Sequence, residues 1–380
     1  MVHASATFID SKKHFLILDA LRGVAAIVVV LFHVLEIYSG GDHVKQFINH
    51  GYLAVDFFFM LSGYVMAHAY DDRWNRMSVK DFFKRRLIRL HPMIIAGMTV
   101  GAIFFYFQES AIFPNIANTS VSMLLIILLI GFTLIPVPLS MDIRGWTEMH
   151  PLNGPAWSLF FEYIANILHA LILRRLSKLL LFVLVCIAAI ALIHLAVNSP
   201  KGDIIGGWSL EPEQLRIGFT RLLFPYMAGM LLRRAINIRE GKSTFLVASL
   251  LLITVLSIPR IGGYQQLWAN GLYDALSIII VFPIIIYLGA IGTVSSVYTE
   301  KICTFLGDVS YPIYIIHYPI AYTFYAWVVN NNIPIEQGFI IGLMIMFLTM
   351  LLSYALLKLY DEPVRKWLAS KLLHTTKKDR

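Results

Sequence analysis

Long apolar runs separated by short polar loops extend along the whole chain of 380 residues. A helix needs about 20 apolar residues to cross the roughly 30 Å hydrocarbon core of a bilayer, and most of the runs approach that length. They are continuously apolar and do not alternate, which excludes a transmembrane β-barrel. The pattern therefore predicts an all-α polytopic membrane protein. Its eleven apolar segments lie roughly at 15–38, 51–70, 87–107, 121–139, 155–173, 179–197, 217–232, 244–258, 271–289, 304–329 and 334–359.

The composition agrees with this class. Hydrophobic residues make up 58% of the chain and charged residues 14%, and the mean hydropathy is +0.70. A soluble domain of this length needs more charge to cover its surface. The polar start, Met1–His14, lacks a small-residue cleavage site, so we expect the first apolar run to remain as a helix. Cys186 and Cys303 have no CxxC partner and are interpreted as packing residues.

The positive charge is distributed unevenly. The net charge is +8, and 25 of the 31 Lys and Arg residues gather in or beside six stretches. This bias is typical of cytoplasmic loops, so it calls for no nucleic-acid partner. Both ends of the chain are then cytoplasmic. The six stretches are 12–22, 73–89, 174–178, 233–242, Lys301 and the tail from Lys358.

Two cytoplasmic ends require an even number of membrane crossings, whereas eleven segments are visible. The weakest segment is 121–139, which is interrupted by Gly131, Pro136 and Pro138. The loops on both sides of it are poor in Lys and Arg. We therefore expect about ten transmembrane helices and one re-entrant or broken segment near 121–139, where irregular backbone is tolerated only if it is buried in protein or lines a cavity.

The first apolar segment carries two ionisable side chains, Arg22 and His33. They are eleven residues apart, which at 100° per residue is three turns plus about 20°, so both lie on one face of a helix about 16 Å apart. Asp19 and Glu36 are each three residues away and can pair with them locally. A structural ion pair with a hydrogen-bonded histidine is one interpretation. We favour a functional site, because ionisable side chains are costly in lipid.

Three other segments carry Asp56, Glu162 and His317. Counting about 1.5 Å per residue places His33 and Asp56 roughly 22–26 Å above the cytoplasmic face of a 30 Å core. Glu162 and His317 lie at roughly 20 Å by the same count, and Arg22 at roughly 10 Å. The four upper groups are therefore expected to share the outer half of the membrane. The arrangement predicts a tunnel with a cationic cytoplasmic end.

A basic cluster, KRRLIRLHP, opens the third segment and contains Arg85, Arg86 and Arg89. A topology anchor alone would explain the stretch from Lys84 to Arg86. Arg89 lies one turn further inward, and a topology anchor explains it less well. Guanidinium groups bind phosphates with two parallel hydrogen bonds, so the cluster also suits a phosphorylated ligand.

Two further stretches place polar side chains on apolar helices. NGPAWSLFFEY contributes Trp157 and Ser158, and Ser158 faces the same way as Glu162 because the two are four residues apart. SYPIYIIH contributes Tyr311 and Tyr314 at a three-residue step that continues to a histidine. Single Trp and Tyr residues in membrane helices are more often interface or packing residues than catalytic ones.

Together these motifs resemble the membrane-bound acyltransferase-3 family, bacterial enzymes that O-acylate carbohydrates and other acceptors. The resemblance covers nearly the whole chain and rests on five motifs in the family's order. Ala54 and His91 stand where the family more often has a glycine and an aromatic residue, and both departures concern helix packing more than the site. The motifs are Arg22–x10–His33, GYLAVDFFFMLSGY with Asp56, RRxxRxxP from Arg85 to Pro92, WSLxxE from Trp157 to Glu162 and SYxxYxxH from Ser310 to His317.

The resemblance implies acyl-CoA, usually acetyl-CoA, as the cytoplasmic donor, no metal, and a hydroxyl-bearing acceptor such as a glycan on the outer side of the bacterial inner membrane. We expect one integral membrane domain over 1–380, without the appended extracytoplasmic domain of some relatives. The expected catalytic residues are His33, Arg22, Asp56, Glu162 and His317. The expected donor-binding residues are Arg22, Arg85, Arg86, Arg89, Tyr311 and Tyr314. The expected acceptor-binding residues are Glu36, Trp157 and Ser158.

Under this hypothesis His33 acts as a general base, oriented by Glu36 or Asp56, or carries the acyl group transiently. Arg22 would polarise the donor or stabilise the developing oxyanion. A secondary transporter with an intramembrane proton relay is the alternative function, and a non-catalytic scaffold is a third. No internal repeat is visible, which argues modestly against a transporter. The sequence leaves the acceptor and the oligomeric state open.

Overall fold

The computed structural model describes residues 14–236 and 241–373, and every regular element within them is a helix. The predicted all-α class is confirmed. Two π-helical turns, Ser277–Val281 and Leu357–Asp361, continue α9 into α10 and α12 into α13. The α-helices are α1 (Leu16–Glu36), α2 (Ala54–Tyr70), α3 (Val79–Phe104), α4 (Val121–Thr133), α5 (Ala156–Leu171), α6 (Lys178–Val197), α7 (Pro212–Ala235), α8 (Phe245–Ser257), α9 (Leu267–Leu276), α10 (Phe282–Ile291), α11 (Val297–Asn331), α12 (Ile335–Leu356) and α13 (Glu362–Leu372).

Every predicted apolar segment contains a helix, and seven helical stretches of the described chain are long and apolar enough to cross a membrane. Two short helices, α4 and α8, differ from them. Each has 13 residues and spans about 20 Å, less than the roughly 30 Å of hydrocarbon. Helix α4 ends where Leu134 adopts a left-handed φ of 60°, just before Pro136 and Pro138. The interruption expected within 121–139 is therefore present.

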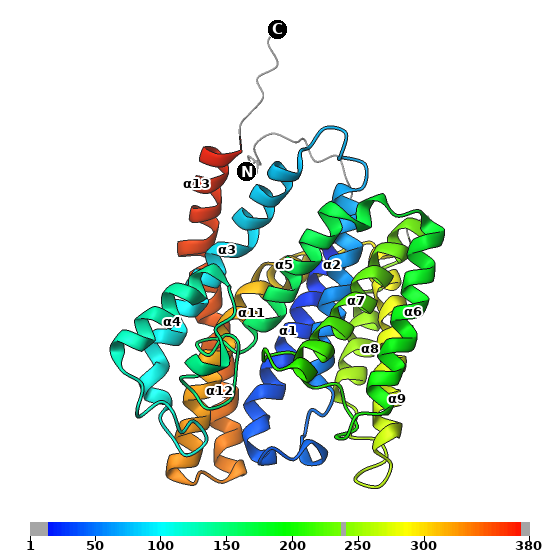
Figure 1. Cartoon of the computed structure of the whole chain (residues 1–380). Helices are drawn as coiled ribbons and strands as arrows, with labels where there is room; N and C mark the ends of the chain where they lie inside the picture. Colours follow the sequence, from blue (N-terminus) through cyan, green and yellow to red (C-terminus); the bar gives the residue numbers. More distant parts are fainter. Residues whose placement is uncertain (1–13, 237–240, 374–380) are drawn as a thin grey trace.

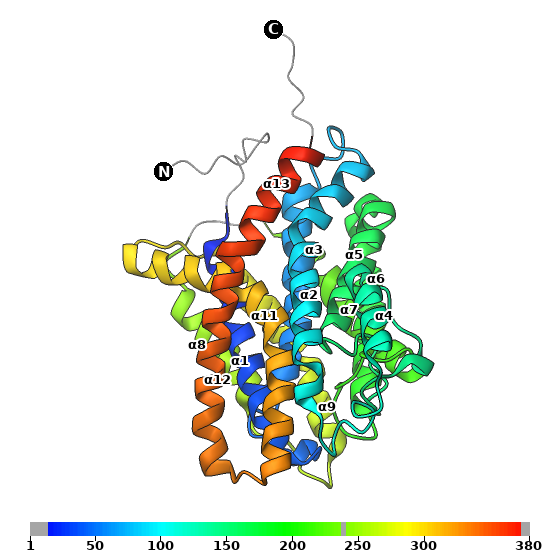
Figure 2. The same cartoon turned by 90° about the vertical axis from the view of Figure 1, so that its left-hand side faces the viewer.

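The helices pack into one bundle in which α1 lies along α11 and α2 lies along α7 (Figures 1 and 2). Glycines permit the second of these contacts. A side chain at Gly63 would collide with the carbonyl oxygen of Tyr226, and one at Gly229 with that of Met60. Close backbone approach by small residues is a common way to pack membrane helices. Gly63 and Gly229 therefore let the backbones of α2 and α7 pack directly against each other.

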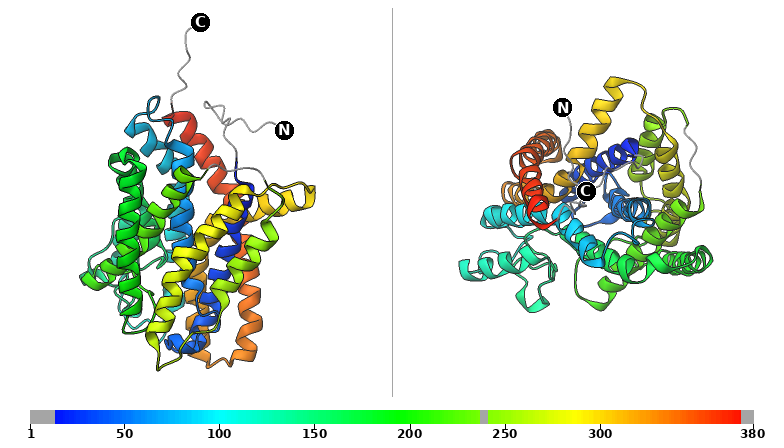
Figure 3. Two further views of the ribbon diagram at one scale, coloured as in Figure 1. Left: turned by 90° about the vertical axis from the view of Figure 1, so that its right-hand side faces the viewer. Right: turned by 90° about the horizontal axis from the view of Figure 1, so that it is seen from above.

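The described chain begins and ends at the same end of the bundle (Figure 1). The first turn of α1, the end of α13 and the loops from α2 to α3 and from α5 to α6 all lie there. Lys84 donates a hydrogen bond of 3.1 Å to the carbonyl of Leu372, which ties α3 to α13. Seen along the bundle axis (Figure 3), α4 (teal) stands at the periphery of the bundle, where it packs on α3.

Candidate active site

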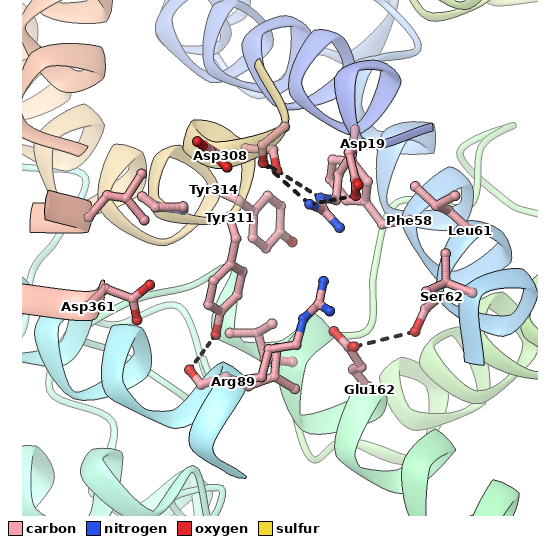
Figure 4. A pocket seen from close by; sticks show the side chains of 18 of the residues that line it. Asp19, Phe58, Leu61, Ser62, Arg89, Glu162, Asp308, Tyr311, Tyr314 and Asp361 are labelled. Carbon is pink, nitrogen blue, oxygen red and sulfur yellow. Dashed lines mark hydrogen bonds and ion pairs between the residues drawn. The ribbon is translucent and has the colours of Figure 1, made fainter. Parts of the chain in front are cut away.

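A cavity of about 350 Å³ opens between α1, α2, α3, α5 and α11 (Figure 4). Its lining also includes His14 and Arg365, so it lies toward the end of the bundle where the described chain begins and ends. Most of the predicted donor-binding residues line it. The polar and aromatic residues of its wall that concern the site are Asp19, Arg22, Phe58, Ser62, Arg86, Arg89, Ser158, Glu162, Ser310, Tyr311 and Tyr314.

Arg22 lies in the cavity wall and is bound by three protein groups. Its Nε donates to the Ser310 hydroxyl at 2.8 Å, and its Nη2 donates to the Gly307 carbonyl at 3.3 Å. The same Nη2 pairs with Asp19 at 3.1 Å, the local pair that the spacing predicts. Asp19 also lies 2.9 Å from the imidazole of His14, and that hydrogen bond raises the pKa of His14. Arg22 is therefore fixed between α1 and α11 by the protein itself.

The arginines of the basic cluster on α3 have different surroundings. Arg86 is buried and pairs with Glu162 at 2.6 Å, so this guanidinium is neutralised within the protein. Arg89 is exposed to the cavity and points into it (Figure 4). It forms no hydrogen bond or ion pair with any residue that the structure describes. Arg85 lies outside the cavity wall. Arg89 is thus the member of the cluster that offers an unpaired cation to a ligand.

Tyrosine and serine side chains close the deep end of the cavity. The hydroxyl of Tyr314 lies 2.7 Å from that of Ser158 and also donates to the Pro155 carbonyl at 3.4 Å. The ring of Phe58 packs edge-on against Tyr314, with 5.4 Å between ring centroids. Tyr311 donates to the backbone carbonyl of α3 residue Leu90 at 2.7 Å. Both tyrosine hydroxyls are therefore engaged by the protein, and their rings line the cavity.

His33 and Glu36 form a pair beyond this wall. Nδ1 of His33 lies 2.8 Å from Oε2 of Glu36, and Tyr325 donates to the same oxygen at 3.0 Å. A carboxylate only accepts hydrogen bonds, so Nδ1 carries the proton and Nε2 is the basic nitrogen. The two side chains remain accessible, at 18% exposure for His33 and 37% for Glu36. The expected local pair is thus present, and it leaves Nε2 of His33 open.

His317 lies directly beside His33. The two imidazole rings stack with 5.4 Å between centroids, and Tyr314 lies 5.8 Å from His317. Nδ1 of His317 is 3.1 Å from the carbonyl of Ile313, so it donates, and Nε2 has no hydrogen-bond partner in the described chain. His317 is 2% exposed. The site therefore contains two neighbouring imidazoles, each with a basic nitrogen that has no hydrogen-bond partner among the described residues.

The structure corrects the expected position of Asp56. Its carboxylate is bound by Arg221 of α7, with Nη2 to Oδ2 at 2.6 Å and Nε 3.2 Å from each oxygen. Arg221 also donates to the carbonyls of Tyr52 and Gly206. The pair is fully buried, and Asp56 does not line the cavity. Asp56 therefore does not orient His33, because the guanidinium of Arg221 occupies its carboxylate. The interpretation of 217–232 as an apolar segment overlooked this guanidinium.

Trp157 is also placed differently from the expectation. Its ring lies 5.3 Å below the Arg221 guanidinium and packs against the Gly207 backbone. It is 7% exposed and does not line the cavity, so it covers the Asp56–Arg221 pair. Ser158, its neighbour, faces the cavity instead. A contact between Trp157 and a substrate would require this packing to open.

The four ionisable groups predicted to share the outer half of the membrane do not form one layer. His33 contacts His317, whereas Glu162 contacts Arg86. The reason lies in where the helices begin: α3 starts at Val79, eight residues before the apolar segment does. Arg86 consequently lies well inside the helix and reaches Glu162, which the depth count had placed far above it.

Several residues around the imidazoles were missed. Tyr318, Tyr322 and Tyr325 continue the stripe of Tyr311 and Tyr314 along α11, and the ring of Tyr318 lies 4.5 Å from that of His33. Their steps of three and four residues were a readable signal. The loop before α5 also contributes residues near the site, and its sequence has no such periodic spacing. Within the described chain no cluster of histidine, cysteine or carboxylate side chains has the form of a metal site.

Comparison with known proteins gives a family match. The family described as an acyltransferase domain matches residues 15–358. The chain is 32% identical over 165 residues to "Protein 2 in picA locus" of Rhizobium radiobacter, which covers 42% of this chain and 82% of that protein. No solved structure resembles the chain significantly.

Two longer matches have named activities. The chain is 23% identical over 338 residues to the peptidoglycan O-acetyltransferase OatA of Listeria monocytogenes, covering 82% of this chain and 50% of the relative. It is 22% identical over 364 residues to the O-acetyltransferase OatA of Staphylococcus aureus, covering 92% of this chain and 57% of the relative. The chain thus spans about half the length of these two relatives.

Proposed function

The chain belongs to the acyltransferase family whose domain matches residues 15–358, and on this premise we propose that it transfers an acetyl group from cytoplasmic acetyl-CoA to a hydroxyl of a cell-envelope glycan. In this reaction the acceptor oxygen bonds to the acetyl carbon, the thioester bond breaks, and the hydroxyl proton ends on the CoA thiol. Two relatives are named O-acetyltransferases, one of them for peptidoglycan, which supports a carbohydrate hydroxyl as acceptor.

We propose a topology of ten membrane crossings in a bacterial inner membrane, with α4 not crossing and both ends of the chain cytoplasmic. The positive-inside bias supports this orientation. So does the common position of the start of α1 and the end of α13 (Figure 2). The cavity then opens toward the cytoplasm, the compartment that contains acyl-CoA.

Arg89 is the proposed anchor of the donor. CoA carries several phosphate charges, and a phosphate reaching this cavity would meet an unpaired guanidinium that can form charge-assisted hydrogen bonds. Arg22 and Arg86 are paired with Asp19 and Glu162, so they add hydrogen-bond donors at positions that the protein fixes but little net charge. Arg85 is not on the cavity wall, so its role would be limited to the entrance. The rings of Tyr311 and Tyr314 would flank the pantetheine arm.

The observation that carries the proposal is the His33–Glu36 pair with His317 stacked against it. Glu36 fixes the tautomer of His33, so the open Nε2 can remove the proton of an acceptor hydroxyl. His317 stacks on His33 and lies beside Tyr314 of the cavity wall, so its Nε2 would receive the proton that His33 removes and pass it to the leaving thiolate. Arg22 would act on the donor from the cavity side. An acetylated His33 intermediate is the competing form of the same mechanism.

For the thioester to meet His33, the wall formed by Tyr314, Ser158 and Phe58 has to open. The Tyr314–Ser158 hydrogen bond is the contact that keeps it closed. We propose that the pantetheine arm displaces this contact and takes its hydrogen-bonding partners. A secondary transporter, the alternative function, has no comparable support from the relatives.

The test uses purified protein, radiolabelled acetyl-CoA and isolated envelope glycan. Wild type is expected to release CoA in an acceptor-dependent way and to leave alkali-labile acetyl groups on the glycan. His33→Ala should lower this rate by about 10²–10⁴-fold while the unfolding temperature stays the same. His194→Ala, which changes an exposed histidine near the end of α6, is the matched control. Full turnover by His33→Ala would reject the role of His33, and glycan movement without CoA release would favour a transporter.

A further inference from the structure

Glu148 lies in the loop between α4 and α5, and the proposed mechanism does not use it. Its Oε1 accepts a hydrogen bond from the Tyr322 hydroxyl, whereas its Oε2 accepts none from the described residues. Arg144 Nε lies 3.4 Å from Oε2, but the hydrogen bonds of Arg144 go to the Pro151 carbonyl and the Gln108 side chain. Glu148 is 5% exposed. A buried carboxylate oxygen with spare hydrogen-bonding capacity is unusual and calls for a partner.

Two tyrosine rings connect this carboxylate to the imidazoles. The ring of Tyr322 lies 4.2 Å from that of Tyr318, which lies 4.5 Å from His33. The loop fits closely around them, since a Cβ at Gly154 would lie 2.6 Å from both Oε1 of Glu148 and the Tyr322 hydroxyl. The position of Gly154 therefore has no room for a larger side chain, and the close loop backbone keeps the Glu148 carboxylate against α11.

Glu148 lies on the far side of the imidazoles from the cavity that Arg22 and Arg89 line. Tyr314 forms the cavity wall, His317 follows it, and Tyr322 lies eight residues beyond Tyr314 on the same helix. At about 1.5 Å per residue this is roughly 12 Å. If the donor arrives through the cavity, the acceptor hydroxyl has to reach His33 from the side on which Glu148 lies.

The surroundings of Glu148 suit a sugar. Arg144 is fully buried between aromatic rings, 4.0 Å from the Tyr322 centroid and 4.8 Å from that of Phe113, and so supplies a fixed positive charge beside the carboxylate. Trp146 packs on Phe113 at 4.9 Å and is 36% exposed. The Trp146 ring lies 6.0 Å from that of Tyr322, which donates to Glu148. Tyr322 therefore connects a carboxylate that can accept a further hydrogen bond to an exposed aromatic ring, a surface on which the apolar face of a sugar ring packs.

We propose that Glu148 is an acceptor-binding residue: its Oε2 accepts a hydrogen bond from one hydroxyl of a carbohydrate acceptor while a different hydroxyl of the same acceptor lies on Nε2 of His33. This inference rests on the proposed function and assigns the class of acceptor, a polyhydroxylated one. It also explains how the site would favour a sugar over water as the acyl acceptor.

The test compares two acyl acceptors in Glu148→Gln at pH 8. Acetyl groups on envelope glycans are measured in cells that produce equal amounts of each variant, and slow acetyl-CoA hydrolysis, with water as acceptor, is measured on the purified proteins. Glu148→Gln should lower glycan acetylation about tenfold more than it lowers hydrolysis, the loss of one hydrogen bond to a charged group. Glu109→Gln, which changes an exposed carboxylate in the loop before α4, should change neither.

Three outcomes would overturn the inference. The first is full glycan acetylation by Glu148→Gln. The second is an equal fall of both reactions in a protein with an unchanged unfolding temperature. The third is the same effect in Glu109→Gln. Failure of the proposed function is distinguishable, because wild type itself would then neither acetylate glycan nor hydrolyse acetyl-CoA.

Discussion

Nδ1 of His33 and Oε2 of Glu36 lie 2.8 Å apart on one turn of α1, and the Tyr325 hydroxyl from α11 lies 3.0 Å from the same carboxylate oxygen. The tyrosine also donates to the backbone carbonyl of His33. This contact fixes the end of α1 to α11. The imidazole is therefore oriented from its own helix and from the helix that carries the second imidazole.

Glu36→Gln should weaken the base without removing it. The amide oxygen can still accept from Nδ1, but the negative charge that stabilises the imidazolium is lost. A hydrogen bond to a charged group contributes about 1.5–3 kcal/mol, so kcat for acetyl transfer should fall by about 10–100-fold, with little change in the KM for acetyl-CoA. Steady-state kinetics against pH measure this. Tyr325→Phe, which keeps the carboxylate, should have a smaller effect, and an unchanged kcat in Glu36→Gln would exclude the proposed pairing role.

Arg89→Gln should weaken donor binding. Arg89 offers an unpaired guanidinium to the cavity, and losing one charge-assisted hydrogen bond should raise the KM for acetyl-CoA by about 10–100-fold. Arg85→Gln is the matched control on the same helix, because Arg85 lies outside the cavity wall. The measurement is the KM for acetyl-CoA of both variants and of wild type. Equal effects of the two substitutions would mean that the cluster acts only through its total charge.

Local relationships were predictable from the sequence because helix geometry determines them. Asp19 and Arg22, like His33 and Glu36, are three residues apart, and both pairs form as expected. Every apolar segment contains a helix for the same reason, whereas α13 lies beyond the last segment and was not predicted. A run of twenty apolar residues has few other ways to satisfy its backbone in lipid.

Relationships between helices were not predictable in the same way. Asp56 meets Arg221 across 165 positions of sequence, and Arg86 meets Glu162 across 76. Such pairs depend on how far each helix extends past its apolar run and on which face it turns inward. Neither quantity is encoded in local spacing, so the depth count alone grouped Glu162 with the wrong partners.

The free energy of unfolding should depend on pH through Glu148. Burial raises the pKa of its carboxyl to about 7 from an ordinary value of 4.5, against the opposing effect of Arg144. Between these values the folded protein holds a proton that the unfolded chain has lost, so stability falls as pH rises toward 7, by about 1.4 kcal/mol per pH unit. Tyr322, Asp142 and Glu36 are the other titratable groups that act on it.

Glu148→Gln cannot ionise and should remove this slope. Melting temperatures of wild type and variant, measured from pH 5 to pH 8.5, should agree best at the acid end. Above pH 7 the variant should be the more stable protein. Tyr322→Phe retains the ionisable carboxyl and should keep the slope. A difference between wild type and Glu148→Gln that is independent of pH would contradict the assignment.

Asp56→Asn should destabilise the fold instead of abolishing a chemical step. It leaves the guanidinium of Arg221, which is 2% exposed, without its carboxylate, and breaking such a buried pair costs about 3–5 kcal/mol. Glu213→Ala is the matched control, because it breaks an exposed pair with Arg216 on the same helix, where the expected cost is about 0–1 kcal/mol. Thermal unfolding in detergent measures both.

The double variant Asp56→Ala with Arg221→Met separates the two interpretations of Asp56. Removing both charges together avoids the uncompensated guanidinium, so stability should return to within about 1–2 kcal/mol of wild type. The remaining difference reflects the carbonyls that Arg221 no longer binds. If Asp56 serves only to bind Arg221, acetyl transfer should return with stability. A double variant that folds as well as wild type but transfers no acetyl group would show that Asp56 takes part in the reaction, and the structural assignment would then be wrong.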